Sequence, residues 1–296
     1  MTWTKPWNSK EGFLIGGGLL LVGLLLQLVA GPIDWSLLAR PVNLILLVLF
    51  LAVVGGMYSL RNRVYAFEWM MHAGAAVPCL TYAAALTILM GLFPQLHSGG
   101  VPWLSRMLHF WPFVLIWAWL VEISALAALN HLLRWKLREI PFILNHAGVA
   151  LAVTAATLGN ADVQTLRMTV FAGQAGWRAL DEAGMTVEAG VGIELHRFIM
   201  EEYPDHTPRR FASDVTVHTK EGKRVTGTVE VNRPMRADGW KIYQYGYDVT
   251  RGPESDCSEF LLVRDPWLPW VYAGIFMMLA GSLCLMLLMA PKPLKT

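Results

Sequence analysis

The sequence predicts a polytopic α-helical membrane protein with a small β-rich domain inserted before its last transmembrane helix. Two observations carry this prediction: long uncharged stretches, and a change of hydrophobic periodicity between the last two of them. The chain has 296 residues, of which 55% are hydrophobic and only 16% charged. Soluble domains carry about 25% charged residues. The deficit is concentrated in the uncharged stretches.

About six stretches are apolar enough to cross a bilayer, which takes about 20 residues because lipid offers the backbone no hydrogen-bond partner. The first could be taken for a signal peptide. Its apolar core is too long for one, and Leu28-Val29-Ala30 is a poor cleavage site, so we expect a membrane anchor. The six expected spans are residues 12–30, 41–60, 73–93, 110–133, 141–158 and 268–290.

Lysine and arginine in the short loops predict the orientation of these spans, because such residues are retained on the cytoplasmic side. The short loops of one side hold only Arg40 and Arg106. Both termini are therefore expected in the cytoplasm, and the long polar segment outside it. The basic residues of the cytoplasmic side are Lys5, Lys10, Arg61, Arg63, Arg134, Lys136, Arg138, Lys292 and Lys295.

Charge and cysteine content exclude several classes of function. The net charge of +2 and the lack of a basic stripe argue against a nucleic-acid partner. The cysteines, Cys79, Cys257 and Cys284, show no CxxC or other paired spacing. A thiol redox motif, a structural zinc site and a disulfide framework are therefore not expected.

Between about residues 159 and 265 the hydrophobic pattern has a period of two. Apolar and polar residues alternate over 185–196, which predicts a strand with one buried face. Further strands are expected from 215, over 225–231, over 240–249 and over 260–263. We expect these strands to form a small antiparallel sandwich or barrel-like sheet.

Tyr243, Tyr245 and Tyr247 alternate along the strand expected at 240–249, which would place them on one face. Two interpretations remain open. The row is either a cross-strand aromatic ladder that supports the sheet, or an exposed platform for an extended peptide or a flat cofactor.

Several motifs in this region resemble one family. The segments are FASDVTV at 211–217, VNRPMR at 231–236, GWKIYQYGYD at 239–248 and VRDPWLPWVYAG at 263–274. They resemble the ectodomain and last helix of the ResB-like family, cytochrome c biogenesis proteins of the System II type that are also called CcsB. Upstream, GLFPQ at 91–95, FWPF at 110–113 and HAGVALAVTAATLG at 146–159 resemble the core helices of that family. The resemblance covers about residues 73–290.

The resemblance implies a division of the chain into four parts, with an ectodomain shorter than is usual for the family. The additional feature is a pair of helices before the family core. The four parts are residues 1–66 with two additional transmembrane helices, 67–159 with a three-helix core, 160–265 with the extracytoplasmic β-rich domain, and 266–296 with the last helix and a cytoplasmic tail.

The resemblance also implies a function in the bacterial cytoplasmic (inner) membrane. A ResB-like protein acts with a CcsA-type partner in haem delivery and covalent haem attachment to apocytochrome c outside that membrane. The tryptophan-rich WG..W.WD loop of CcsA is missing from this sequence, so this chain would need that partner. It would be a component of a haem lyase complex without a catalytic residue of its own, and would hold haem b transiently.

By its motif, His146 matches the family's histidine at the inner start of the third core helix, which the resemblance implicates in a haem site shared with CcsA. A neutral imidazole can ligate haem iron. The alternative is an interfacial histidine bonded to a headgroup or a backbone carbonyl. His72 and His131 lack a family counterpart and are expected to be interfacial, although their depth also permits an intramolecular haem b site. The other histidines are His97, His109, His196, His206 and His218.

Glu122 lies near the middle of the fourth expected span, where a carboxylate is costly and usually faces a bundle interior, a cavity or a partner. It is either protonated and hydrogen-bonded to Ser124 or another helix, or part of a proton path or polar-ligand site. Asn43 and Asn130 pose milder versions of the same question.

The alternative to haem delivery is a haem b- or quinol-binding subunit of a respiratory complex. A small-solute transporter is disfavoured, because the sequence contains no inverted repeat.

Overall fold

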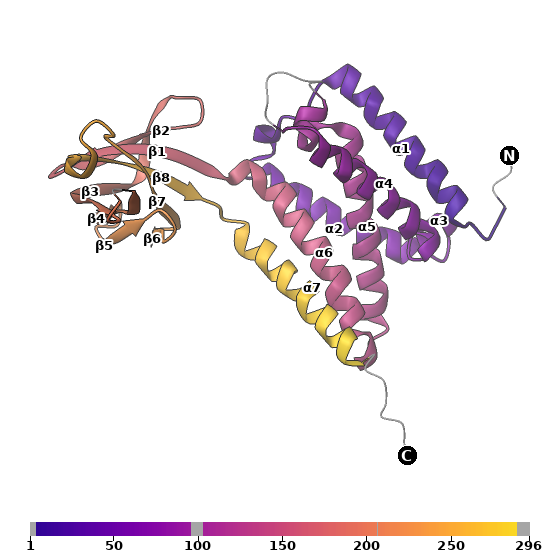
Figure 1. Cartoon of the computed structure of the whole chain (residues 1–296). Helices are drawn as coiled ribbons and strands as arrows, with labels where there is room; N and C mark the ends of the chain where they lie inside the picture. Colours follow the sequence, from indigo (N-terminus) through magenta and orange to yellow (C-terminus); the bar gives the residue numbers. More distant parts are fainter. Residues whose placement is uncertain (1–3, 96–102, 206, 289–296) are drawn as a thin grey trace, which may run out of the picture. The chain divides into compact units, whose positions relative to one another are not determined.

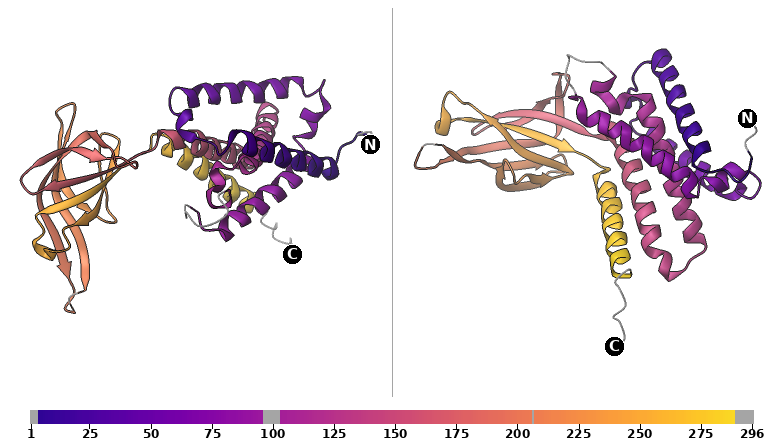
Figure 2. Two further views of the ribbon diagram at one scale, coloured as in Figure 1. Left: turned by 90° about the horizontal axis from the view of Figure 1, so that it is seen from above. Right: turned by 45° about the vertical axis from the view of Figure 1, so that its right-hand side comes forward.

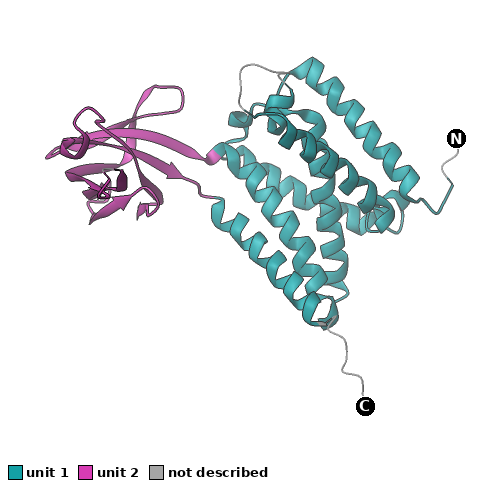
Figure 3. Ribbon diagram, in the orientation of Figure 1, with its two compact units in different colours: residues 1–161, 267–296 teal, residues 162–266 magenta. Residues whose placement is uncertain are grey.

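The computed structural model describes residues 4–95, 103–205 and 207–288 (Figure 1). The chain forms two compact units, residues 1–161 with 267–296 and residues 162–266 (Figure 3). In sequence, the second unit lies between the last two long helices of the first.

The first unit is helical, and six of its helices are long and apolar enough to cross a membrane. They confirm the six expected spans to within a few residues at the ends that the structure describes. A short helix, α3, was not expected. The helices are α1 Ser9–Ala30, α2 Val42–Leu60, α3 Tyr65–Trp69, α4 Ala73–Leu92, α5 Trp111–Leu133, α6 Ile140–Gly159 and α7 Leu268–Leu288.

Helix α5 is the centre of this unit. In its most apolar window 61% of the residues are buried, compared with 28% or less in the other five spans. It packs against α1, α2, α4 and α6. Gln27 of α1 is 4% exposed, and its Oε1 accepts a hydrogen bond from the backbone N–H of Trp111, the first residue of α5. A helix that begins at a buried position needs such an acceptor because its first amides have no partner in the helix.

Helices α6 and α7 lie side by side along much of their length (Figure 1). They approach so closely because glycines face each other across the contact. A Cβ atom on Gly274 would lie 2.6 Å from both the backbone N of Ala152 and the O of Gly148. At the far end, a Cβ on Gly159 would lie 2.4 Å from Cβ of Trp267. Small residues allow this backbone approach, which is a common device between membrane helices.

Helix α2 lies at the periphery of the helical unit (Figure 2), and only 11% of its most apolar window is buried. Its one fully buried polar side chain among the described residues is Asn43, which is 0% exposed. The amide Nδ2 of Asn43 donates to the carbonyl of Leu158, 3.0 Å away, in the last turn of α6. Carbonyls in the last turn lack a partner within their helix, so α2 supplies one.

We expect Asn43→Ala to weaken the attachment of α2 to the bundle by about 1–2 kcal/mol, the usual value of a hydrogen bond between membrane helices or slightly above. Hydrogen exchange of α2 and of the last turn of α6 in bilayer nanodiscs would measure it. Ser59→Ala is the control, because its hydroxyl bonds only to Gly55 O within α2. Equal protection in both variants would contradict the anchoring role.

The second unit is an antiparallel sheet of eight strands in the order β5-β4-β3-β2-β1-β8-β7-β6. Figure 2 shows that the sheet curls, and the edge strand β5 contacts β6 and β7. This confirms the predicted β-rich domain and corresponds to its barrel-like alternative. The strands are β1 Gln164–Phe171, β2 Ala175–Leu180, β3 Thr186–Glu202, β4 Pro208–Thr219, β5 Arg224–Glu230, β6 Met235–Ala237, β7 Trp240–Tyr247 and β8 Cys257–Arg264.

The inner face of the curled sheet forms one apolar core. Met168 and Val170 of β1 and Ile193 and Leu195 of β3 are at most 2% exposed. Strand β3 continues to Glu202, beyond the expected end at residue 196, and pairs with β4 over that length. A register shift between Leu195 and Arg197 changes which residues face inward, so the alternation that predicted the strand ends there although the strand does not. Strands β1, β2 and β6 were not expected from the sequence.

Candidate functional site

A cavity of about 430 Å³ opens between four helices of the helical unit. Three of its lining side chains are polar: Ser124 of α5 and Asn145 and His146 of α6. The rest of the wall is apolar apart from the indole of Trp117, whose Nε1 is buried without a hydrogen bond among the described residues. The apolar lining residues are Ala76 and Leu80 of α4, Leu120 and Ile123 of α5, Val149 and Val153 of α6, and Met278 of α7.

His146 has a defined hydrogen-bonding state within this wall. Its Nδ1 lies 2.9 Å from the carbonyl oxygen of Phe142, one turn earlier in α6. Because a carbonyl only accepts, Nδ1 carries the proton, and in a neutral imidazole Nε2 then keeps its lone pair. Nε2 makes no hydrogen bond to any residue that the structure describes. It is therefore available as a ligand for a metal or as an acceptor for a hydroxyl.

Asn145, the neighbouring polar residue, is not available in the same way. Its Nδ2 donates to the Pro141 carbonyl at 2.9 Å, and its Oδ1 accepts from the Ser282 hydroxyl of α7 at 3.0 Å. These bonds fix the α6–α7 contact near Gly281, where an added Cβ would lie 2.7 Å from Asn145 Nδ2. Asn145 thus supports the wall of the cavity.

His131 lies close to His146 but does not line the cavity. Its Nδ1 is 3.1 Å from Oε2 of Glu139, and its ring faces the ring of Phe142 with the centroids 4.1 Å apart. The other side of this phenyl ring stacks on His146, with a centroid distance of 3.8 Å and an interplanar angle of 21°. Phe142 contacts both imidazoles, and the structure does not bring His131 and His146 together as two ligands of one group.

His72 is also outside the cavity. It precedes α4, its side chain is exposed, and its imidazole makes no hydrogen bond within the described ranges. The remaining histidines with described positions serve local structure: His109 bonds Ile33 O, His196 bonds Thr216, and His218 bonds Glu194. His97 and His206 lie outside the described residues. Within the parts of the chain that the structure describes, no group of three or more His, Cys, Asp or Glu side chains could hold a metal ion.

Glu122 does not line the cavity either. Its carboxyl group is partly buried on α5 and makes neither a hydrogen bond nor an ion pair with any described residue. The expected hydrogen bond to Ser124 is therefore not formed. Ser124 lines the cavity, 5% exposed, while Glu122 belongs to another face of the same helix. Asn43, in contrast, is explained by its bond to Leu158.

The tyrosine row requires a correction. A register shift between Gln244 and Gly246 inserts an extra residue into β7, and Tyr247 lies opposite the fully buried Ser258. Tyr247 stacks on Phe198, with centroids 4.8 Å apart, and on Phe211 at 5.2 Å. A bulge changes which face the following side chains occupy, so the prediction of one common face is wrong for Tyr247.

The other two tyrosines differ from each other. Tyr245 is 50% exposed, and the Arg167 guanidinium of β1 lies 4.8 Å from its ring centroid. Tyr243 is partly buried and lies opposite Leu261 of β8. A continuous aromatic platform is therefore not formed by these three residues.

The motif residues of the β domain build the sheet. Ser213 of the FASDVTV segment is 0% exposed and donates to Oε1 of Gln244, from the GWKIYQYGYD segment, at 2.6 Å. Ser258 of β8 is 2.7 Å from the same hydroxyl, and Gln244 Nε2 donates to Gly246 O across the bulge. Hydrogen bonds from the Thr228 hydroxyl and then from Arg197 lower the pKa of Asp214. These residues are needed to hold β4, β5, β7 and β8 together.

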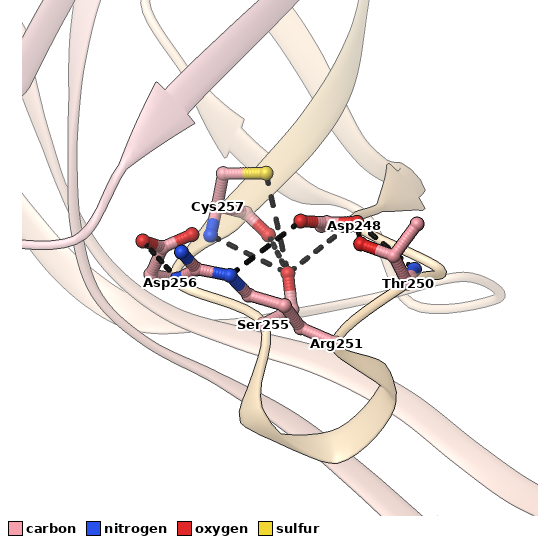
Figure 4. A network of polar contacts seen from close by, with 6 residues as sticks. All are labelled: Asp248, Thr250, Arg251, Ser255, Asp256 and Cys257. Carbon is pink, nitrogen blue, oxygen red and sulfur yellow. Dashed lines mark hydrogen bonds and ion pairs between the residues drawn. The ribbon is translucent and has the colours of Figure 1, made fainter.

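The connection between β7 and β8 is a polar turn (Figure 4). Asp248 accepts from the N–H and the hydroxyl of Thr250, and Arg251 pairs with Asp256. Ser255 accepts from the N–H of Asp248 and donates to the carbonyl of Cys257. These bonds join residues within the turn to one another, so the cluster orders the chain between the strands.

These features define a class of protein: a multi-pass membrane protein with an inserted β-barrel-like domain and a lateral cavity that presents one imidazole. The sequence model of the ResB-like family matches residues 134–255. Two proteins named cytochrome c biogenesis protein CcsB, from Prochlorococcus marinus strains NATL1A and NATL2A, are each 30% identical over 102 residues.

Residues 134–255 of this chain are therefore similar to the ResB/CcsB family. The match to the two relatives covers 34% of this chain, and the chain spans about a quarter, 23%, of their length. The family model includes α6 with His146 and the sheet as far as the turn after β7. It does not reach α4, α5, β8 or α7, so the resemblance expected over 73–290 is shown for the middle of that range.

Proposed function

We propose that this chain is a cytochrome c biogenesis factor of the ResB/CcsB type that takes up haem at the His146 cavity. The observation that carries the proposal is the state of His146: it lines the cavity, its Nδ1 is committed to a carbonyl, and Nε2 retains a lone pair. It lies in the segment matched by the family. Haem is cargo in this proposal, and haem b is the form present before covalent attachment.

The residues of the cavity fit such a cargo. Apolar side chains from four helices suit a macrocycle, a single imidazole suits an axial position on iron, and the thioether of Met278 is a further soft donor in the wall. His131 is not in the wall, so this chain would supply one imidazole. A CcsA-type partner in the same bilayer would supply the remaining ligand, which agrees with transient binding.

The sidedness of the chain follows from its basic loops. We place both termini in the cytoplasm and the β domain outside the cytoplasmic (inner) membrane of a bacterium, because Lys and Arg gather in the loops at one side of the spans. His146 is in the second turn of α6, close to the cytoplasmic loop that begins at Arg134. Haem would enter near the inner side, and apocytochrome c would be met by the β domain outside.

In this function the chain needs no catalytic residue. Thioether formation on an apocytochrome c depends on placing reduced haem beside the thiols, and positioning alone can supply much of such a rate enhancement. The chain would be the scaffold and ligand-bearing component of a haem lyase complex.

The second candidate is a haem b- or quinol-binding subunit of a respiratory complex. The cavity favours it in one respect, because its wall is mainly apolar and Nε2 of His146 could accept a hydrogen bond from a quinol hydroxyl. A stoichiometric low-spin haem b with a reversible potential in the isolated chain would support that function.

We expect His146→Ala, expressed with a CcsA-type partner, to lower co-purified haem and the yield of c-type cytochrome about tenfold or more, because the iron loses its ligand from this chain. Pyridine haemochrome spectra and haem-stained gels measure both. His72→Ala is the matched control, as an exposed histidine outside the cavity. Unchanged haem content in His146→Ala would refute the proposed function.

A further inference from the structure

Four side chains that touch one after another, Glu139, His131, Phe142 and His146, form a row that ends at the cavity. Glu139 holds His131 through a bond of 3.1 Å, His131 faces Phe142 at 4.1 Å, and Phe142 faces His146 at 3.8 Å. Glu139 is itself held by Arg138, whose Nε lies 3.2 Å from Oε1. Only the last member of this row lines the cavity.

The two contacts that Phe142 makes to His146 restrain different motions of the imidazole. Its backbone carbonyl accepts from Nδ1, which selects the tautomer with a lone pair on Nε2. Its phenyl ring lies nearly parallel to the imidazole, 21° from coplanar, and blocks rotation of the ring toward His131. The same phenyl ring is held from its other face by His131.

We propose that Phe142 is a positioning residue for His146, held in place by His131, so that the cavity offers a single, oriented imidazole nitrogen to an incoming haem iron. The proposal rests on the proposed function for the cargo, but it assigns roles that the function does not require. In particular, it makes His131 a stacking partner and excludes it as a ligand of the iron.

The first test needs no haem. In the full chain in nanodiscs with ¹⁵N-labelled histidine, the His146 resonances are assigned by their loss in His146→Gln. We expect a single tautomer protonated at Nδ1 in both chains, because the backbone carbonyl of residue 142 remains, but resonances broadened by rotation of the imidazole in Phe142→Ala, which lacks the stacked phenyl ring. A residue with a purely structural role would alter stability and leave these resonances unchanged, and that result would overturn the positioning role.

The second test uses ferric haem titrated into the same full-length chains. We expect Phe142→Ala to raise the Kd about tenfold, the usual effect of removing a group that orients a metal ligand. His131→Phe keeps an aromatic face against Phe142 but has no nitrogen, so its Kd and visible spectrum should match the wild type. His131→Ala removes the face and should weaken binding.

The outcomes separate the two proposals. If His131→Phe loses haem as His146→Ala does, His131 is a ligand and the positioning role is wrong. If His146→Ala binds ferric haem as the wild type does, the proposed function fails. If His146→Ala loses haem while Phe142→Ala keeps both its Kd and its His146 resonances, only the positioning role fails. If Phe142→Ala does not fold, Phe142→Leu replaces it, because leucine fills the space but has no aromatic ring to stack on His146. Its Kd for haem and its His146 resonances are then compared with those of the wild type.

Discussion

We expect Gly274→Leu to separate α6 from α7 and to destabilise the helical unit by about 3 kcal/mol or more, at the upper end for overpacking. The atoms that a Cβ at this position would meet are the backbone N of Ala152 and O of Gly148, both at 2.6 Å. Backbone atoms cannot rotate away as a flexible side chain can. The helices must therefore move apart, and the cavity wall, to which Met278 contributes from α7, must open with them.

The matched control for this substitution is Gly56→Leu in α2, where an added Cβ meets nothing within 4 Å. Steric trapping or denaturant unfolding in micelles would compare the two variants, and co-purified haem would report on the cavity. A Gly274→Leu chain as stable as Gly56→Leu would show that α6 and α7 do not need this close contact.

We expect Gln244→Met to destabilise the β domain by about 2–4 kcal/mol, because it removes the acceptor of the buried Ser213 hydroxyl, whose remaining partner is Ser258, and removes the donor to Gly246 O. Both serines are 0% exposed, so water cannot replace the lost partner. Hydrogen exchange of β4, β7 and β8 in the full chain should accelerate. Gln174→Met, in the exposed turn between β1 and β2, is the control.

A compensating variant tests the reason for that loss. Ser213→Ala and Ser258→Ala together with Gln244→Met remove the pair of buried hydroxyls that Gln244→Met alone leaves short of one acceptor, so part of the protection should return. If the triple variant exchanges as fast as the sum of the separate changes predicts, the three side chains are independent and the buried network is not a unit.

The spans could be read from the sequence because the bilayer imposes one requirement, a long uncharged helix, that leaves a continuous signal. The sheet was harder to predict. Strand β1 turns Leu166, Met168 and Val170 inward, an alternation of period two that the sequence contains but that is too short to stand out beside the longer pattern at 185–196. Strand β6 has three residues and carries too little pattern to be recognised, and the bulge in β7 reversed the face of Tyr247.

The candidate site, too, could be predicted only in part from the sequence. The motif around His146 distinguishes it in the sequence from His131 and His72, which lack a family counterpart, but hydropathy, which places all three at a similar depth, does not separate the one that lines a cavity from the others. That separation depends on the helices that pack around each imidazole: α4, α5 and α7 complete the cavity beside His146, whereas Phe142 stands between His146 and His131. The cavity wall combines residues from segments that are far apart in the sequence, and hydrophobic periodicity along the chain does not show which residues come together.

The sequence by itself determined that this protein is a multi-pass membrane protein with a β-rich insertion and a ResB-like segment, because hydropathy and ordered motifs are local properties of the chain. Only the tertiary structure decided that Ser213, Asp214 and Gln244 hold the sheet together, that Tyr247 faces Phe198 and Phe211, and that His146 alone of the described histidines lines the cavity. Each of these features depends on contacts between residues far apart in the sequence. Tertiary packing determines these contacts, and the local sequence pattern does not.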